Sequence, residues 1–173
     1  MDRLIADGMI TSSAVEAAFR TVPRHAFVPA GTPLEVVYDV DRSVITKTDE
    51  HGVHLSSVSA AYIQARMIEQ AGVGPGMRVL EIGSGGYNAA LLAEVVGVDG
   101  HVVSVDIDAD ITDRARVLLR ETGYDHRVRV LQVDAVHGVP GEGVFDRIIV
   151  TVGAWDIPPA WLVLQRHFAC LRW

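Results

Sequence analysis

The sequence predicts an α/β domain built on a mostly parallel sheet. Short apolar runs rich in branched residues occupy residues 78–82, 101–105, 128–133 and 145–152, and segments with helical periodicity alternate with them. A glycine-rich turn directly follows the first run, and aspartates follow the second and third. Because the carboxyl ends of parallel strands meet at one edge of a sheet, these features predict a ligand site at that edge.

The composition is typical of one globular domain. The chain has 173 residues, of which 49% are hydrophobic and 21% charged, with a formal net charge of −7. No apolar run is long enough for a membrane span, and no signal peptide opens the chain. The acidic balance argues against nucleic acid as a partner, and the single cysteine, Cys170, cannot form an internal disulfide. We therefore expect a cytoplasmic protein without a membrane or nucleic-acid partner.

The first 72 residues predict a cap over the sheet edge. Thr11 or Ser12 can cap a helix that Pro23 ends, and residues 44–46 and 53–55 are candidates for two short paired strands. His51 and His54 lie near the loop between these strands without a third convergent ligand, so we predict no metal site there. We expect a single domain, with residues 1–72 on the substrate side and residues 73–173 as the core.

The hydroxyl-rich segment before residue 60 allows two interpretations. A clear amphipathic helix spans residues 60–71, so Ser57 or Ser59 can serve as its N-terminal cap. The same hydroxyls can instead face a ligand. The residues alone leave both alternatives open.

The glycine turn contains Gly83, Ser84 and Gly85, and a helical pattern takes over at residue 89. A strand, a glycine turn and a helix together place a helix N-terminus against a nucleotide-like ligand, although glycines also occur in such turns for steric reasons alone. Asp106 ends the second strand about 20 positions later, where an aspartate can hold both hydroxyls of a ribose. Asp108 or Asp110 is the better candidate for capping the next helix.

Residues 79–85, VLEIGSG, resemble the first motif of class I S-adenosylmethionine-dependent methyltransferases. More narrowly, the chain resembles protein-L-isoaspartate O-methyltransferases, through residues 22–29 (VPRHAFVP), 57–67 (SVSAAYIQARM), the glycine turn and residues 145–151 (FDRIIVT). The resemblance implies a Rossmann-like fold and methylation of a carboxyl group on isoaspartyl or aspartyl residues of peptides or proteins. It implies that Ser59 binds the substrate carboxylate. The residues that it implies for S-adenosylmethionine are Ser57, Glu81, Gly83, Ser84, Gly85, Asp106, Ile107, Asp134, Ala135 and Thr151.

Asp134, which follows the third strand, would hold the adenine amino group in this superfamily. A capping or loop role for this aspartate is the alternative.

Three departures from the family are expected to matter. The glycine turn is one residue short, and Ala60-Ala61 replaces the family's Gln-Pro. With residues 46–52 and 153–159, the short turn resembles the lanthipeptide-linked FxLD-system branch, which modifies an aspartate of a dedicated peptide. Residues 166–173 match nothing in the family, so we expect its last strands to be missing and the open sheet edge to be covered, for example in a homodimer.

Two alternatives to this function remain. One is a methyltransferase of the same fold that acts on another acceptor. The other is a non-catalytic cofactor-binding fragment.

Overall fold

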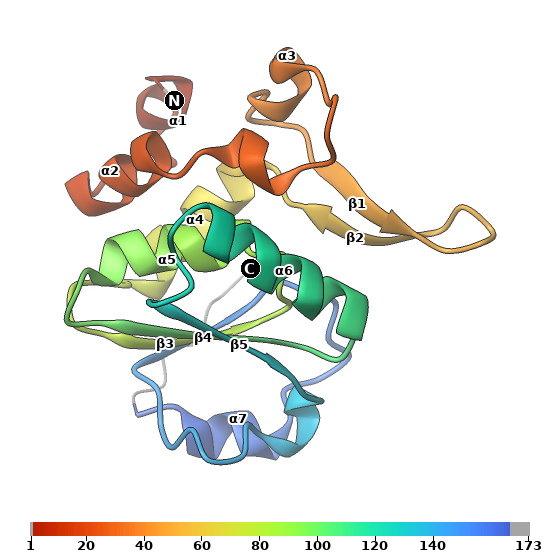
Figure 1. The fold of residues 1–173 in the computed structure, drawn as a ribbon. Coiled ribbons are helices and arrows are strands. Elements are labelled where there is room, and N and C mark those ends of the chain that lie inside the picture. The colour runs from red at the N-terminus through yellow and green to blue at the C-terminus, as the bar shows by residue number, and fades with distance from the viewer. Residues whose placement is uncertain (1, 167–173) are drawn as a thin grey trace.

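The computed structural model describes residues 2–166, which form a four-stranded parallel sheet with helices on both faces (Figure 1). The strands are β3 (Arg78–Ile82), β4 (His101–Asp106), β5 (Val128–Gln132) and β6 (Arg147–Val150). Helices α4 (Ala61–Ala71), α5 (Tyr87–Val96) and α6 (Ala109–Glu121) lie on one face, and α7 (Pro159–Leu164) lies on the other. The predicted α/β fold class is therefore confirmed.

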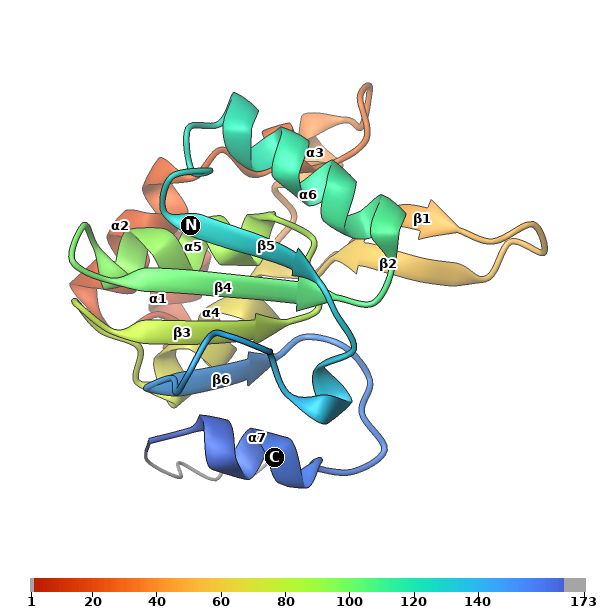
Figure 2. The same ribbon diagram turned by 60° about the horizontal axis from the view of Figure 1, so that its bottom comes forward.

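The order of the strands fixes where a ligand can bind. The sheet runs β5-β4-β3-β6, and Figure 2 shows the four strands side by side. From β3 the chain moves outward through β4 to β5, and it then crosses back to place β6 on the other side of β3. The direction of winding reverses at β3, and the carboxyl ends beside such a reversal are where open α/β sheets bind ligands.

Alternate residues of β3 are buried on opposite faces of the sheet, because side chains alternate along a strand. Val79 packs into the larger core with Leu92 of α5, whereas Leu80 packs into the smaller core with Trp161 of α7. The Trp161 indole N–H also donates a hydrogen bond of 2.7 Å to the backbone carbonyl of Ala135. This bond ties α7 to the short helix η2 (Ala135–His137), which follows β5.

The N-terminal helices form an outer layer above α4 and α5 (Figure 1). They are α1 (Asp2–Ala6), α2 (Ser13–Thr21), η1 (Arg24–Phe27) and α3 (Leu34–Val37). Ser12 caps α2 as predicted, since its hydroxyl accepts a hydrogen bond of 3.3 Å from the Val15 amide. Within residues 2–166, no helix is both long and apolar enough to cross a membrane.

An antiparallel hairpin of β1 (Val44–Thr48) and β2 (His54–Val58) projects beside the sheet. Strand β2 is longer than predicted and includes Ser57, which pairs with Ile45 of β1. The capping alternative for Ser57 and Ser59 is wrong, because the cap residue of α4 is Ala60 and no side chain caps that helix. Ser57 lies in the paired strand and Ser59 follows that strand, so both serines precede the helix and their hydroxyls remain available.

Two further expectations concern the end of the chain. Strand β6 is shorter than the predicted strand over residues 145–152. Phe145 instead forms an isolated parallel bridge with Gln165, beyond α7. Cys170 lies outside the described residues, and so does all of the segment 166–173 except Arg166.

Candidate active site

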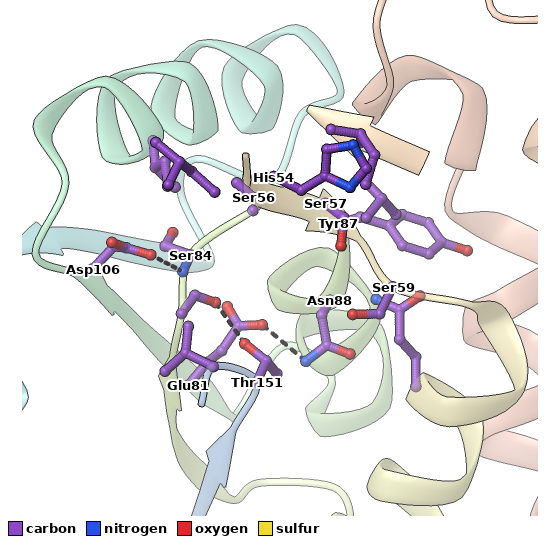
Figure 3. A pocket seen from close by; sticks show the side chains of 18 of the residues that line it. His54, Ser56, Ser57, Ser59, Glu81, Ser84, Tyr87, Asn88, Asp106 and Thr151 are labelled. Atoms are coloured by element: carbon purple, nitrogen blue, oxygen red, sulfur yellow. Dashed lines mark hydrogen bonds between the residues drawn. The ribbon is translucent and has the colours of Figure 1, made fainter. Parts of the chain in front are cut away.

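A cavity of about 300 Å³ lies at the carboxyl ends of the sheet strands. Its walls come from β2, the link from β2 to α4, the glycine turn after β3, the start of α5, the end of β4 and residues 151–153. In Figure 3, Asp106 and Ser59 lie at opposite sides of this cavity, and Glu81 and Thr151 lie between them. The predicted residues that line it are Ser57, Ser59, Glu81, Gly83, Ser84, Gly85, Asp106 and Thr151.

Gly83 is required at the first position of the turn. Its φ of +105° is unfavourable for residues with a Cβ, and a Cβ placed there would lie 2.5 Å from Thr151 Oγ1. The Thr151 hydroxyl is within hydrogen-bond distance of the carbonyls of Ile82 (3.0 Å) and Gly83 (2.9 Å). The turn is therefore packed directly against the residue that follows β6. At Gly85, by contrast, a Cβ would approach only the Ser57 carbonyl, at 3.9 Å.

Asp106 holds the turn from the other side. Its Oδ2 accepts a hydrogen bond of 3.1 Å from the Ser84 amide, and its Oδ1 accepts one of 3.0 Å from the Asp108 amide (Figure 3 shows the first). Each carboxylate oxygen can accept a second bond, so this side chain can also bind a pair of hydroxyls. Asp108 caps α6 through the amides of Asp110 and Ile111, as predicted for one of these two aspartates.

A second cavity of about 340 Å³ adjoins the first through Gly83 and Asp106. Its other predicted residues are Ile107, Asp134 and Ala135, and the rings of Trp155 and Trp161 also line it. Asp134 accepts a hydrogen bond of 3.0 Å from the Val136 amide and so caps η2. The capping interpretation of Asp134 is thus correct, and its place in the cavity leaves a binding role open as well. The two cavities together suit an elongated ligand with a polar end and a flat ring.

Glu81 is completely buried below the first cavity. Its carboxylate accepts a hydrogen bond of 2.8 Å from Asn88 Nδ2 and another from the Ser104 hydroxyl. Burial, which disfavours the charged form, raises the pKa of Glu81 to about 7. Glu81 therefore links β3 to β4 and to the start of α5.

Two buried polar atoms beside this cavity have no hydrogen-bond partner among residues 2–166. They are the Ser84 hydroxyl and the side-chain carbonyl oxygen of Asn88. Buried polar groups nearly always form hydrogen bonds, so two such atoms without a partner in a cavity wall indicate that polar atoms of a ligand bind there. Within residues 2–166, no group of three or more His, Cys, Asp or Glu side chains could hold a metal ion.

Ser59 lies on the link between β2 and α4. Its backbone carbonyl accepts a hydrogen bond of 2.9 Å from Arg24 Nη2, whereas its hydroxyl makes no hydrogen bond within the described chain. Ser57 also lines the cavity, two residues earlier in the chain, on β2. Arg24 thus holds the backbone of Ser59, and the Ser59 hydroxyl remains free to contact a ligand.

Comparison with known proteins identifies the family. The family model for "Protein-L-isoaspartate(D-aspartate) O-methyltransferase" matches residues 1–165. This chain belongs to the protein-L-isoaspartate O-methyltransferase family. The enzyme of that name from Methanopyrus kandleri is 40% identical over 163 residues, which cover 94% of this chain and 69% of that protein.

Solved structures of the family share the fold. A protein-L-isoaspartate O-methyltransferase with 34% sequence identity has a TM-score of 0.84, over 94% of this chain and 50% of that one. A second structure, from Plasmodium falciparum, has a TM-score of 0.78 over 95% of this chain at 18% identity, which shows the fold alone. The chain thus spans half to about two thirds of the length of two of these family members. Membership of the lanthipeptide-linked branch stays a prediction.

Sequence reasoning missed several residues of the site, of which three are polar or aromatic residues of α4 and α5. Gln64, Tyr87 and Asn88 all line the first cavity, and none was singled out as a candidate. Tyr87 and Asn88 lie directly after the glycine turn and could have been found from that position. Gln64 had no comparable signal, because a polar residue within an amphipathic helix usually belongs to the solvated face.

Proposed function

We propose that this chain transfers a methyl group from S-adenosylmethionine to a carboxylate of an isoaspartyl or aspartyl residue in a peptide or protein. The observation that supports this most strongly is that the first cavity is lined both by the edge of the sheet and by the N-terminal segment. The sheet edge contributes Gly83 and Asp106, and the N-terminal segment contributes the free hydroxyl of Ser59.

The residues of the sheet edge fit the cofactor. Asp106 would bind the ribose hydroxyls, and the second cavity, with Asp134 and Ile107, would hold the adenine. The unpaired atoms of Ser84 and Asn88 would meet the polar amino-acid end. The fold neighbour from Plasmodium falciparum was solved in complex with S-adenosyl-L-homocysteine, which supports this use of the fold. When bound, the cofactor supplies an electrophilic methyl group on a sulfonium.

The acceptor needs no general base, because a carboxylate with an ordinary pKa near 4 is ionised at neutral pH. The task of the protein is to align one carboxylate oxygen with the methyl carbon and to exclude water. Ser59 would donate a hydrogen bond to the other oxygen and so fix the carboxylate. Transfer would break the methyl–sulfur bond as the oxygen–methyl bond forms, so it would yield a methyl ester and S-adenosylhomocysteine and would require no proton transfer.

Two measurements test this proposal. Calorimetric titration with S-adenosylhomocysteine should show saturable binding. Transfer of labelled methyl groups should occur to a synthetic peptide with one L-isoaspartyl residue and should be far weaker for the same peptide with the residue replaced by alanine. Binding without transfer to any carboxylate peptide would refute the acceptor, and absence of binding by the folded chain would refute the cofactor.

Other features of the function are proposals of the same kind. A dedicated peptide substrate, as in the lanthipeptide-linked branch, would show as transfer to an aspartyl residue within one particular sequence. A homodimer at the β6 edge of the sheet predicts a concentration-dependent mass in analytical ultracentrifugation. We also retain the expectation of a cytoplasmic protein with one domain, in which residues 1–72 form the substrate side.

A further inference from the structure

Arg24 is a buried cation beside the active-site cavity. Arg24 is only 2% exposed to solvent, and its guanidinium carbon lies 5.1 Å from the centre of the Tyr87 ring. It donates hydrogen bonds to neutral acceptors, namely the carbonyls of Val37, Arg42 and Ser59 and Oε1 of Gln64, and its other side-chain partner is Tyr87, which is also neutral. No carboxylate within residues 2–166 forms an ion pair with it. A buried charge without a counter-ion is costly, so this charge favours an anion nearby.

The bond from Arg24 fixes the orientation of the Gln64 amide. Arginine can only donate hydrogen bonds, so the oxygen of the Gln64 amide must face Arg24 Nη1, at 3.0 Å. The NH₂ group therefore points the other way. Gln64 is 4% exposed and lines the cavity, and its Nε2 has no hydrogen-bond partner in the described part of the chain.

Gln64 and Ser59 are close along the start of α4. The backbone amide of Gln64 donates a hydrogen bond to the carbonyl of Ala60, the residue after Ser59. Gln64 therefore lies one helical turn after Ala60. Side chains of a helix lean toward its N-terminus, so the Gln64 amide leans toward Ser59. Arg24 contacts both residues, through the carbonyl of Ser59 and the side chain of Gln64.

We propose that Gln64 is a second donor to the substrate carboxylate, and that Arg24 positions it and supplies the positive charge behind it. This inference rests on the proposed function. Nε2 of Gln64 and the Ser59 hydroxyl together bind one carboxylate oxygen and leave the other free to accept the methyl group. The buried guanidinium polarises the amide and so strengthens its donor end.

A neutral donor suits this reaction better than a direct ion pair. Arginine commonly binds both oxygens of a carboxylate in a bidentate pair, which would occupy the oxygen that must attack. An amide donor occupies one acceptor position only. The positive charge of Arg24 still favours the ionised carboxylate over an uncharged group in the same cavity.

The test replaces the donor while keeping the acceptor that Arg24 needs. Gln64→Glu preserves the shape and the bond from Arg24, but it turns the cavity end into an oxygen. Gln70→Glu, an exposed position on the same helix, is the matched control for the charge change. Gln64→Met removes the donor without adding charge. It therefore still tests the donor role if Gln64→Glu perturbs folding. Thermal melting of each variant monitors folding.

The readouts are the KM for the isoaspartyl peptide, the Kd for S-adenosylhomocysteine, and binding of a peptide analogue whose α-carboxylate is a carboxamide. Gln64→Glu should raise the KM by about tenfold to a hundredfold, the range for losing a hydrogen bond to a charged group, and leave the Kd unchanged. It should also abolish the preference for carboxylate over carboxamide. Gln64→Met should raise the KM as well, and Gln70→Glu should behave like the unaltered chain.

The outcomes distinguish a failure of the role of Gln64 from a failure of the proposed function. If the unaltered chain methylates the peptide and Gln64→Glu keeps both its KM and its preference for carboxylate, the role of Gln64 is refuted and the proposed function stands. If the unaltered chain binds S-adenosylhomocysteine but neither binds nor methylates the peptide, the proposed function is refuted and this inference with it.

Discussion

Replacing Asp106 with alanine tests the cofactor side of the site directly. The two oxygens of Asp106 accept bonds from the amides of Ser84 and Asp108, at 3.1 and 3.0 Å, and each oxygen keeps one further acceptor position for a ribose hydroxyl. Alanine removes all four interactions. We therefore expect a loss of affinity for S-adenosylhomocysteine together with a loss of stability.

The two effects have different magnitudes. Hydrogen bonds to a charged group contribute about 1.5–3 kcal/mol each, and the low end for two hydroxyls gives about 3 kcal/mol. That free energy corresponds to about a hundredfold increase in the Kd for S-adenosylhomocysteine. The loss of the two backbone amide contacts should lower the free energy of unfolding by about 1–2 kcal/mol.

Calorimetric titration of the folded variants measures the first effect, and chemical denaturation measures the second. Asp108→Ala is the matched control, because Asp108 caps α6 and pairs with Lys47 at 2.6 Å but lines neither cavity. It should lower stability by about 1 kcal/mol, as for a lost cap, and leave the Kd unchanged. A folded Asp106→Ala variant with unaltered affinity would refute the ribose assignment. Equal weakening in both variants would assign the effect to the N-terminus of α6 instead.

Three other predictions concern single residues. Gly83→Ala should lower the free energy of unfolding by several kcal/mol more than Gly31→Ala, as measured by urea denaturation. Both glycines have a positive φ, but only at Gly83 would a Cβ collide with Thr151. Equal losses of stability in the two variants would contradict the close packing at Gly83. Ser59→Ala should lower kcat/KM for an isoaspartyl peptide by about tenfold or more while S-adenosylhomocysteine binds normally, and an unchanged kcat/KM would exclude the serine as a donor. Burial raises the pKa of Glu81 from 4.5 to about 7. A raised carboxyl pKa stabilises the folded state below the unfolded pKa, and this contribution is lost as the pH rises from about 4.5 to about 7. Glu81→Gln should therefore gain stability relative to the unaltered chain over that range, and a constant difference in Tm would refute the shift.

Local sequence patterns predicted the sheet side of the site well. Each sheet strand reads as a short apolar run, and Gly83, Asp106 and Asp134 could be placed because strand ends in a parallel sheet converge. Their neighbours in sequence are also their neighbours in space: Asp106 accepts a hydrogen bond from the amide of Asp108, the N-cap of the next helix, and Asp134 caps the short helix that follows it. The ligand edge of the sheet is encoded locally.

The N-terminal side of the site was predicted less well, because its contacts join residues far apart in the chain. The serine segment was expected to allow helix capping, yet pairing with β1 places Ser57 in a strand. The bond between Arg24 and Gln64 spans 40 positions, and the one between Arg24 and Ser59 spans 35. No periodicity reports such pairs, since each residue alone reads as an ordinary polar position in a turn or helix.

Other long-range contacts explain why the two sides form one site. Lys47 on β1 pairs with Asp108 at 2.6 Å and with Asp110 at 2.9 Å, so the hairpin is held against the start of α6. Arg114 of α6 donates a hydrogen bond of 2.6 Å to the carbonyl of Phe27, so the same helix also holds the N-terminal layer. Helix α6, which Asp108 caps, thus connects the sheet to the hairpin and to the N-terminal layer, and under the proposed function it would set the distance between the cofactor and the Ser59 hydroxyl. For the proposed transfer, which requires in-line alignment and no proton transfer, that distance is the main quantity that the fold would have to control.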